Sequence, residues 1–166
     1  MNEVLHLDIG WNKLSFSPPS EMGLLGKLEY FYANDNDLLG PLPSEVGMLR
    51  SLQYLNISSN RVFGTLPTEI GRLTKLKVLD GSWSSFSGTI PYEARNLVEL
   101  SVLSLQSNFL IGDVASLDGL MRLTSLRVLD VGKNKLDGSF PDVWPYEDTR
   151  VTELYLDGNE IRGSIP

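Results

Sequence analysis

The chain contains no cysteine, a single histidine and no long apolar run. Without cysteine it can form neither a disulfide nor a Cys–His catalytic pair. A Ser–His–Asp arrangement would depend on His6 alone, and the pattern described below places His6 at a surface position. The longest apolar stretches are far shorter than the roughly 20 residues of a membrane-spanning helix, and no signal peptide is recognisable. We therefore predict a protein that is not an enzyme and that does not insert this segment into a membrane.

Positive charge is scarce as well. Lysine and arginine number 14 against 21 aspartate and glutamate residues, which gives a net charge of −7. This balance argues against nucleic acid or an anionic membrane surface as the partner. No glycine-rich phosphate loop occurs, and the run from Asn34 to Asp37 lacks the ligand spacing and the closing glutamate of a calcium loop. We predict no cofactor and no metal site.

One pattern fills the chain instead, a motif that recurs about every 24 residues. Its most regular member is an asparagine, followed in most copies by glycine four residues later and by proline seven residues later. A period this regular indicates a solenoid, which offers an extended surface rather than a deep pocket. The asparagine positions, with one serine among them, are Asn12, Asn36, Asn60, Ser84, Asn108, Asn134 and Asn159.

Residues 52–73 read LQYLNISSNRVFGTLPTEIGRL, which resembles the leucine-rich repeat of the plant and algal type, LxxLxxLxLxxNxLxGxIPxxLGxL. The resemblance covers the whole chain in seven copies. It implies an α/β repeat fold, a right-handed solenoid with a parallel β-sheet on its concave face and mostly irregular or 3-10 structure on its convex side. It also implies that the Gly-x-Ile-Pro stretch forms a second short strand. The copies begin near Val4, Leu28, Leu52, Leu76, Leu100, Leu126 and Val151.

Within each copy, two apolar residues such as Leu55 and Ile57 are separated by the period of a strand, so both point to one face. Tyr54 and Asn56 then point to the other face. The recurring asparagine follows where the chain turns out of the strand, and its amide can both donate to and accept from turn backbone groups. Ser84 can do only part of this, so we expect the fourth coil to be looser there.

The outward strand positions form columns along the predicted sheet. Because adjacent strands lie about 4.8 Å apart, Tyr30, Tyr32 and Tyr54 should cluster. Exposed aromatic side chains beside carboxylates are typical of recognition surfaces; the alternative is that tyrosine simply favours strands. The residues predicted to bind a protein or peptide partner are Tyr30, Tyr32, Tyr54, Asp80, Trp83, Gln106, Asp130 and Tyr155.

Two copies depart from the pattern. The fifth has two extra residues and no proline, and the sixth carries residues 143–150 in place of the usual glycine and leucine. Irregular coils often carry function on this architecture, so Trp144 and Tyr146 are predicted as a secondary contact; the alternative is that Trp144 fills the core. Asn56 begins the one N-glycosylation acceptor of the chain and is a predicted glycosylation site if the protein is secreted.

The composition shows no break, so we expect residues 1–166 to form a single solenoid, as part of a longer chain and without its caps. By resemblance, the predicted function is a protein-recognition scaffold, part of a secreted or membrane-tethered receptor-like protein with the repeats outside the cell. One alternative is an architectural subunit of a large assembly that uses its coil ends and its sixth coil. Another is an inhibitor, or a module that binds carbohydrate or ice, although the outward columns lack the threonine array that would favour ice.

Overall fold

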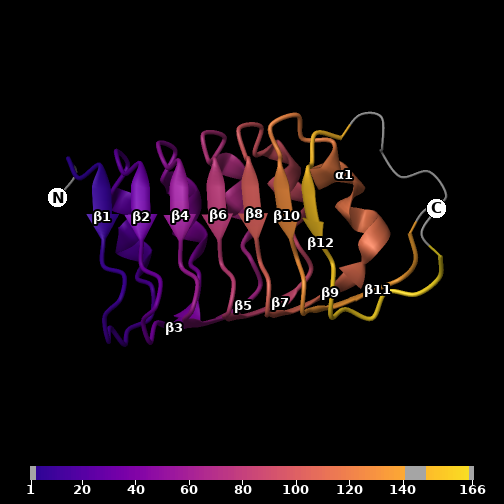
Figure 1. The fold of residues 1–166 in the computed structure, drawn as a ribbon. Coiled ribbons are helices and arrows are strands. Elements are labelled where there is room, and N and C mark those ends of the chain that lie inside the picture. The colour runs from indigo at the N-terminus through magenta and orange to yellow at the C-terminus, as the bar shows by residue number, and fades with distance from the viewer. Residues whose placement is uncertain (1–2, 141–148, 165–166) are drawn as a thin grey trace.

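A computed structural model describes residues 3–140 and 149–164 of the chain. Its short strands lie side by side in chain order, one from each predicted copy, and every neighbouring pair is parallel (Figure 1). This arrangement confirms the predicted leucine-rich-repeat solenoid. The strands of the seven-stranded sheet are β1 (His6–Asp8), β2 (Tyr30–Tyr32), β4 (Tyr54–Asn56), β6 (Val78–Asp80), β8 (Val102–Ser104), β10 (Val128–Asp130) and β12 (Glu153–Tyr155).

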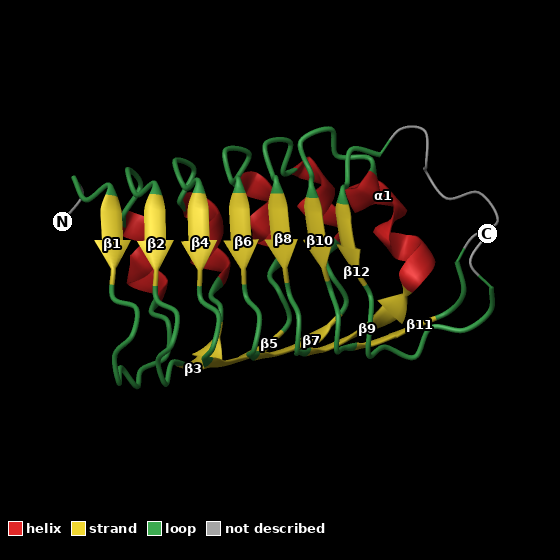
Figure 2. Ribbon diagram, in the orientation of Figure 1, coloured by secondary structure: helices red, strands yellow, loops and turns green. Residues whose placement is uncertain are grey.

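A second parallel sheet of five described strands runs along one edge of the solenoid (Figure 2). Its strands are β3 (Leu39–Pro41), β5 (Arg61–Gly64), β7 (Ser85–Gly88), β9 (Phe109–Asp113) and β11 (Lys135–Asp137).

Short helical turns cover the far side of the seven-stranded sheet (Figure 2). Five are 3-10 turns and one is a four-residue α-helix, and no helix among the described residues is long and apolar enough to cross a membrane. The turns are η1 (Ser20–Leu24), η2 (Ser44–Met48), η3 (Thr68–Arg72), η4 (Tyr92–Asn96), η5 (Val114–Leu117) and α1 (Asp118–Met121).

The second strands lie earlier in the repeat than expected, which corrects our prediction for the Gly-x-Ile-Pro stretch. Strand β5 ends at Gly64, which has a φ of +82°, and Leu66 and Pro67 follow it. Proline has no N–H for a strand ladder, whereas its fixed φ suits the residue that leads into a helical turn. Pro67 and Pro91 accordingly stand immediately before η3 and η4.

The core is a continuous layer between the seven-stranded sheet and the helical turns. Leu55 and Ile57 both point into it and are 0% and 3% exposed, as the strand period predicted. Each coil buries its apolar side chains against the next coil, whereas Leu7 and Leu154 in the outermost strands are only partly buried. A single coil has no core of its own, so the coils are stable only when stacked.

The recurring asparagines join neighbouring coils. Asn108 donates to the carbonyls of Leu105 and Gln106 in its own turn and to that of Gly81 one coil earlier, and its Oδ1 accepts from the N–H of Phe86. Equivalent bonds surround Asn36, Asn60, Asn134 and Asn159.

Ser84 takes the asparagine position in the fourth coil without making these bonds. Its hydroxyl is buried, and within residues 3–140 and 149–164 it has no hydrogen-bond partner. Serine was expected to make part of the bonds that asparagine makes, so this expectation was wrong. Its shorter side chain leaves a gap in the ladder between the third and fourth coils.

Glycines set the spacing of the helical turns. A Cβ placed on Gly47 would lie 2.6 Å from the carbonyl oxygen of Glu69, and one on Gly71 would lie 2.5 Å from that of Glu93. Both distances are shorter than any ordinary contact, so a residue with a side chain cannot hold this spacing. The glycine of the LGxL motif therefore lets η2, η3 and η4 pack closely.

Candidate binding face

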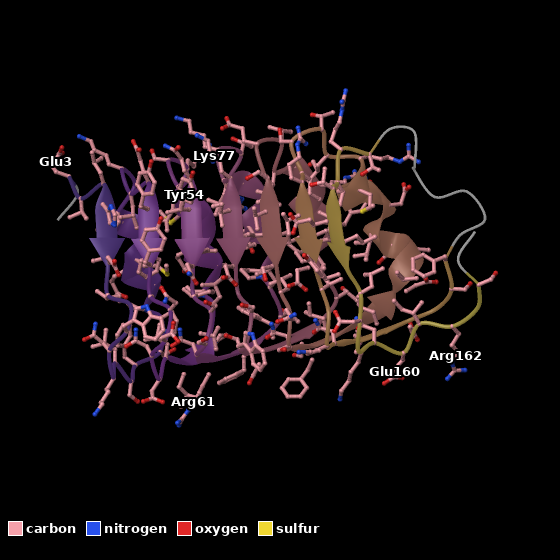
Figure 3. All side chains as sticks on the ribbon, viewed as in Figure 1. Glu3, Tyr54, Arg61, Lys77, Glu160 and Arg162 are labelled. Carbon is pink, nitrogen blue, oxygen red and sulfur yellow. The ribbon has the colours of Figure 1, made fainter. Side chains whose placement is uncertain are left out.

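The face of the seven-stranded sheet turned away from the helical turns, called here the sheet face, is the predicted concave face. Figure 3 shows Tyr54 projecting from it. The strand register places equivalent residues of successive copies side by side, as predicted. The first column consists of His6, Tyr30, Tyr54, Val78, Val102, Val128 and Glu153. The second consists of Asp8, Tyr32, Asn56, Asp80, Ser104, Asp130 and Tyr155.

An aromatic row occupies the N-terminal end of the sheet face. The rings of Tyr30 and Tyr54 stack with centroids 5.0 Å apart and planes within 13°. His6 stacks on the other side of Tyr30 at 5.5 Å and lies 5.5 Å from the ring of Tyr32. The structure therefore brings the three predicted tyrosines together and adds His6, which the list of predicted binding residues omitted. Its place in the first column was the available signal.

The hydroxyl of Tyr32 lies in an environment that disfavours its ionisation. Burial raises the pKa of Tyr32, and Tyr54, Tyr30 and Asp8 add to the effect in that order. Tyr32 consequently keeps its proton and remains a neutral hydrogen-bond donor at physiological pH.

Carboxylates occupy the C-terminal half of the sheet face. Burial raises the pKa of Asp130, and Asp157 and Asp80 raise it further, against a bond from the N–H of Gly132 and the charge of Lys133. Asp130 and Asp80 lie in the same column with Ser104 between them. The neighbouring carboxylates disfavour the ionised form of Asp130, and a cation placed beside it would offset that repulsion.

Tyr155 and Gln106 lie in the same half. The Tyr155 hydroxyl donates to Glu153 at 2.9 Å, and this bond is the main reason that the pKa of Tyr155 is raised. The carbonyl of Gln106 accepts from the N–H of Trp83 at 2.8 Å, which joins the fourth and fifth coils, while the Gln106 side chain is half-buried on the sheet face.

A further column follows each strand at a backbone position that the sequence did not predict to be special. Six non-glycine residues there have positive φ values between 52° and 56°. The column exposes two tryptophans, Trp11 (80% exposed) and Trp83 (56% exposed), and the ammonium of Lys133 lies 5.5 Å from the centre of the Trp83 ring. Trp11 and Lys133 are additions to the predicted site. The six residues are Trp11, Asp35, Ser59, Trp83, Ser107 and Lys133.

Three further predicted residues belong to the secondary contact and the glycosylation site. Trp144 and Tyr146 lie outside the described residues. Asn56 is half-buried on the sheet face, where its Oδ1 accepts from the N–H and hydroxyl of Ser58 at 3.0 and 2.7 Å; its glycosylation stays a prediction. Over the described ranges, no group of three or more histidine and acidic side chains is placed to hold a metal ion.

Comparison with known proteins gives a consistent picture. A family model described as a leucine-rich repeat region matches residues 3–143. No match to a curated protein sequence was found.

Several solved structures superpose on the chain. The crystal structure of a TDR receptor is 32% identical over 93% of this chain, with a TM-score of 0.86. The crystal structure of PEPR1-AtPEP1 is 28% identical over 99%, with a TM-score of 0.93. The Arabidopsis receptor kinase HAESA, in complex with the peptide hormone IDA and the co-receptor SERK1, is 27% identical over 98%, with a TM-score of 0.77. The chain spans 26%, 23% and 31% of those chains, about a quarter to a third of their length.

A plant ice-binding protein is also similar, with 25% identity over 93% of this chain and 57% of its own, and a TM-score of 0.73. One fold therefore serves more than one kind of surface recognition, and the side chains must decide between them. The first two columns of the described sheet face contain no threonine. An array of matching threonines at these positions would favour ice binding, and aromatic and acidic side chains occupy several of them instead.

Proposed function

The chain belongs to the leucine-rich repeat family, and on that premise we propose that its sheet face binds a peptide or an extended protein segment, as part of a receptor-like protein. The similar HAESA structure holds a peptide hormone and a co-receptor, which supports a partner of this class. Two further similar structures are the LRR ectodomains of the Arabidopsis receptor kinases GASSHO1/SCHENGEN3 and SOBIR1, which supports an extracellular location for the repeats.

The aromatic row is the observation that carries the proposal. His6, Tyr30 and Tyr54 stack on three adjacent strands, and Tyr32 flanks them. Aromatic side chains of this kind dominate the energetics of protein interfaces because they bury a large area at a small cost in conformational entropy. The parallel ladder beneath them fixes their positions before a partner arrives, so little further entropy is lost on binding.

Charge narrows the class of partner. Six carboxylates lie on the strands of the described sheet face or in the turns that directly follow them, and they face one lysine, Lys133, besides His6. A segment with lysine or arginine side chains would complement this field, with its cations over the half that contains Asp80 and Asp130 and an apolar or aromatic group over the tyrosines. The six carboxylates are Asp8, Asp35, Asp80, Asp130, Glu153 and Asp157.

The experiment selects peptides from a random library displayed on phage against the folded chain, followed by calorimetric titration of the selected peptides. We expect the selected sequences to be enriched in lysine or arginine beside an aromatic or aliphatic residue. Tyr32→Ala and Trp83→Ala should each weaken binding by about fivefold or more, the loss typical of a buried aromatic anchor, without unfolding the protein.

Phe63→Ala provides the matched control, because Phe63 is an aromatic residue 46% exposed on strand β5 of the other sheet. Its affinity should equal that of the unsubstituted chain. Unchanged affinity in both the Tyr32 and the Trp83 variants, or a loss confined to the Phe63 variant, would exclude the sheet face as the binding surface.

A further inference from the structure

Within the described residues, the convex side of the solenoid departs from its repeat between the fourth and fifth coils. In the first three coils the LGxL glycines are Gly23, Gly47 and Gly71, and the equivalent residue of the fourth coil is Arg95. The close approach seen at the glycines leaves no room for a Cβ. Arg95 therefore prevents the fifth coil from packing against η4 as the earlier turns pack against one another.

The fifth coil accommodates this change. It has two extra residues, lacks the proline before its turn and continues η5 into α1. Gly119 of α1 faces Arg95, and a Cβ there would lie 3.9 Å from Cδ of Arg95, an ordinary contact. The η4 and α1 turns consequently stand apart, and a cleft of about 250 Å³ opens between them.

The cleft is lined largely by apolar groups. Ile90 and Pro91 form part of one wall on the fourth coil, and Leu117 and Leu120, both almost fully buried, form part of the other on the fifth. Clefts of about 300–1,000 Å³ enclose drug-sized ligands. A volume of about 250 Å³ accommodates a smaller apolar body.

One cation is fixed at the lining of this cleft. The guanidinium of Arg95 lies 3.1 Å from the centre of the Tyr92 ring. Tyr92 is itself a departure from the repeat, because Ser20, Ser44 and Thr68 occupy its position in the earlier coils. Two unusual residues, three positions apart on the fourth coil, therefore stack on each other at the point where the coils separate.

The guanidinium N–H groups of Arg95 are available to a ligand. In the described part of the chain, no carboxylate and no hydrogen-bond acceptor is paired with its guanidinium. Stacking occupies one face of the guanidinium, and its N–H groups, which suit a carboxylate bidentately, remain available. The hydroxyl of Ser116 on the opposite wall offers a further donor.

We propose that this cleft binds a small amphipathic monocarboxylate, with its apolar body between Pro91 and Leu117 and its carboxylate on Arg95. One guanidinium matches one negative charge, whereas a phosphate dianion would leave charge unpaired in an apolar cleft. The site lies on the convex side, so it is independent of the binding proposed for the sheet face.

The test is a titration of the ¹⁵N-labelled chain with 4-phenylbutyrate, followed by amide chemical shifts. The matched neutral probe is 4-phenylbutanol, which has the same ring and chain without the carboxylate. We expect saturable shifts confined to residues 89–95 and 116–120, with a dissociation constant of about 0.1–1 mM, which is typical of a ligand of this size.

The charge-specific variant is Arg95→Gln, and Arg72→Gln is its control because Arg72 is an exposed arginine at the end of the preceding turn. Binding of the carboxylate should weaken about three- to tenfold in Arg95→Gln, as a partly exposed charge-assisted contact is lost, and should stay unchanged in Arg72→Gln. The alcohol should bind the unsubstituted chain as weakly as the carboxylate binds Arg95→Gln. An absence of saturable shifts, equal affinity for the two probes, or equal affinity in Arg95→Gln would each overturn the proposal.

Discussion

Single side chains decide how firmly neighbouring coils are joined. The amide of Asn108 bonds three carbonyls and one N–H across two coils. Each such bond contributes about 0.5–1.5 kcal/mol, and a buried polar atom left without a partner costs about 1–3 kcal/mol. Ser84 both forgoes these bonds and buries an unpaired hydroxyl, so the junction between the third and fourth coils is the weakest of the asparagine ladder.

Restoring the amide should strengthen this junction. We expect Ser84→Asn to raise the free energy of unfolding by about 1 kcal/mol, because it supplies the missing bonds, and to raise the melting temperature by about 2–4 °C for a chain of this size. Urea denaturation measures the change. Ser85→Asn, one residue along, should change stability by less than about 0.5 kcal/mol. A less stable Ser84→Asn protein would contradict the explanation.

Asp130, a residue predicted to bind a partner, is in conflict with the stability of the fold. Its pKa is raised by burial and by neighbouring carboxylates, so the folded chain holds its proton more tightly than the unfolded chain does. The stabilisation linked to that proton is complete below the unfolded pKa and is lost as the pH rises through the folded pKa. At neutral pH the ionised Asp130 therefore disfavours folding.

Asp130→Asn should remove this conflict. Asparagine can still accept the bond from the N–H of Gly132, so we expect a gain of a few tenths of a kcal/mol at pH 7, small because the group is partly solvated. The free energy of unfolding should be measured from pH 3 to pH 7. It should be the same for the variant and the unsubstituted chain at the acidic end, and it should become higher for the variant as the pH rises. A variant that is less stable at pH 7 would refute the assigned cause.

At the scale of elements, each strand of the seven-stranded sheet is three residues long, and the chain leaves it through a residue with positive φ. For a bulky residue such as Trp83 this conformation costs about 1–2 kcal/mol. The recurring asparagine that follows in most coils bonds the carbonyls around this corner, as Asn108 does, and so holds the conformation. At Trp83 this turn directs the tryptophan side chain outward. The sheet face therefore extends beyond the strands themselves.

The helical turns depend on glycine for their spacing. Gly71→Ala would place a Cβ 2.5 Å from the carbonyl oxygen of Glu93, which backbone movement must relieve. We expect a loss of about 1–3 kcal/mol in the free energy of unfolding, the usual cost of overpacking. Gly26→Ala is the matched control, because no described atom lies within 4 Å of its added Cβ, and it should be neutral or slightly stabilising. Equal stability of the two variants would contradict the packing argument.

Across the whole molecule, stability is distributed along one dimension. Each described coil packs only against its sequence neighbours, so an outer strand such as β1 or β12 has one partner in the sheet and an inner strand has two. Free energy in such a molecule is approximately the sum of coil and interface contributions. The sheet face is consequently most rigid near its middle.

Hydrogen exchange of the folded chain should report this gradient. We expect the amides of β6 and β8 to be the slowest to exchange and those of β1 and β12 the fastest, because local opening needs fewer contacts to break at the ends. The measurement is native-state exchange followed by nuclear magnetic resonance. Uniform protection across the seven strands would show that the chain opens as a single unit instead.

Much of this molecule was predictable from the sequence because its information is repeated. The period placed Tyr30 beside Tyr54 and Asp80 in the same column as Asp130, and the parallel register confirmed both. We predicted the second strands too late in the repeat. The glycine and proline of each copy mark where its second strand ends rather than where that strand lies. Whether the predicted residues bind a partner stays a prediction.

Repetition dictated the register, the inward and outward faces and the composition of the sheet face, because residues at equal positions in stacked coils must become neighbours. Stacking in three dimensions decided the rest. The unsatisfied hydroxyl of Ser84 and the cleft opened by Arg95 both arise where one coil meets the next. Their consequences depend on distances between backbones, which no single copy of the motif encodes.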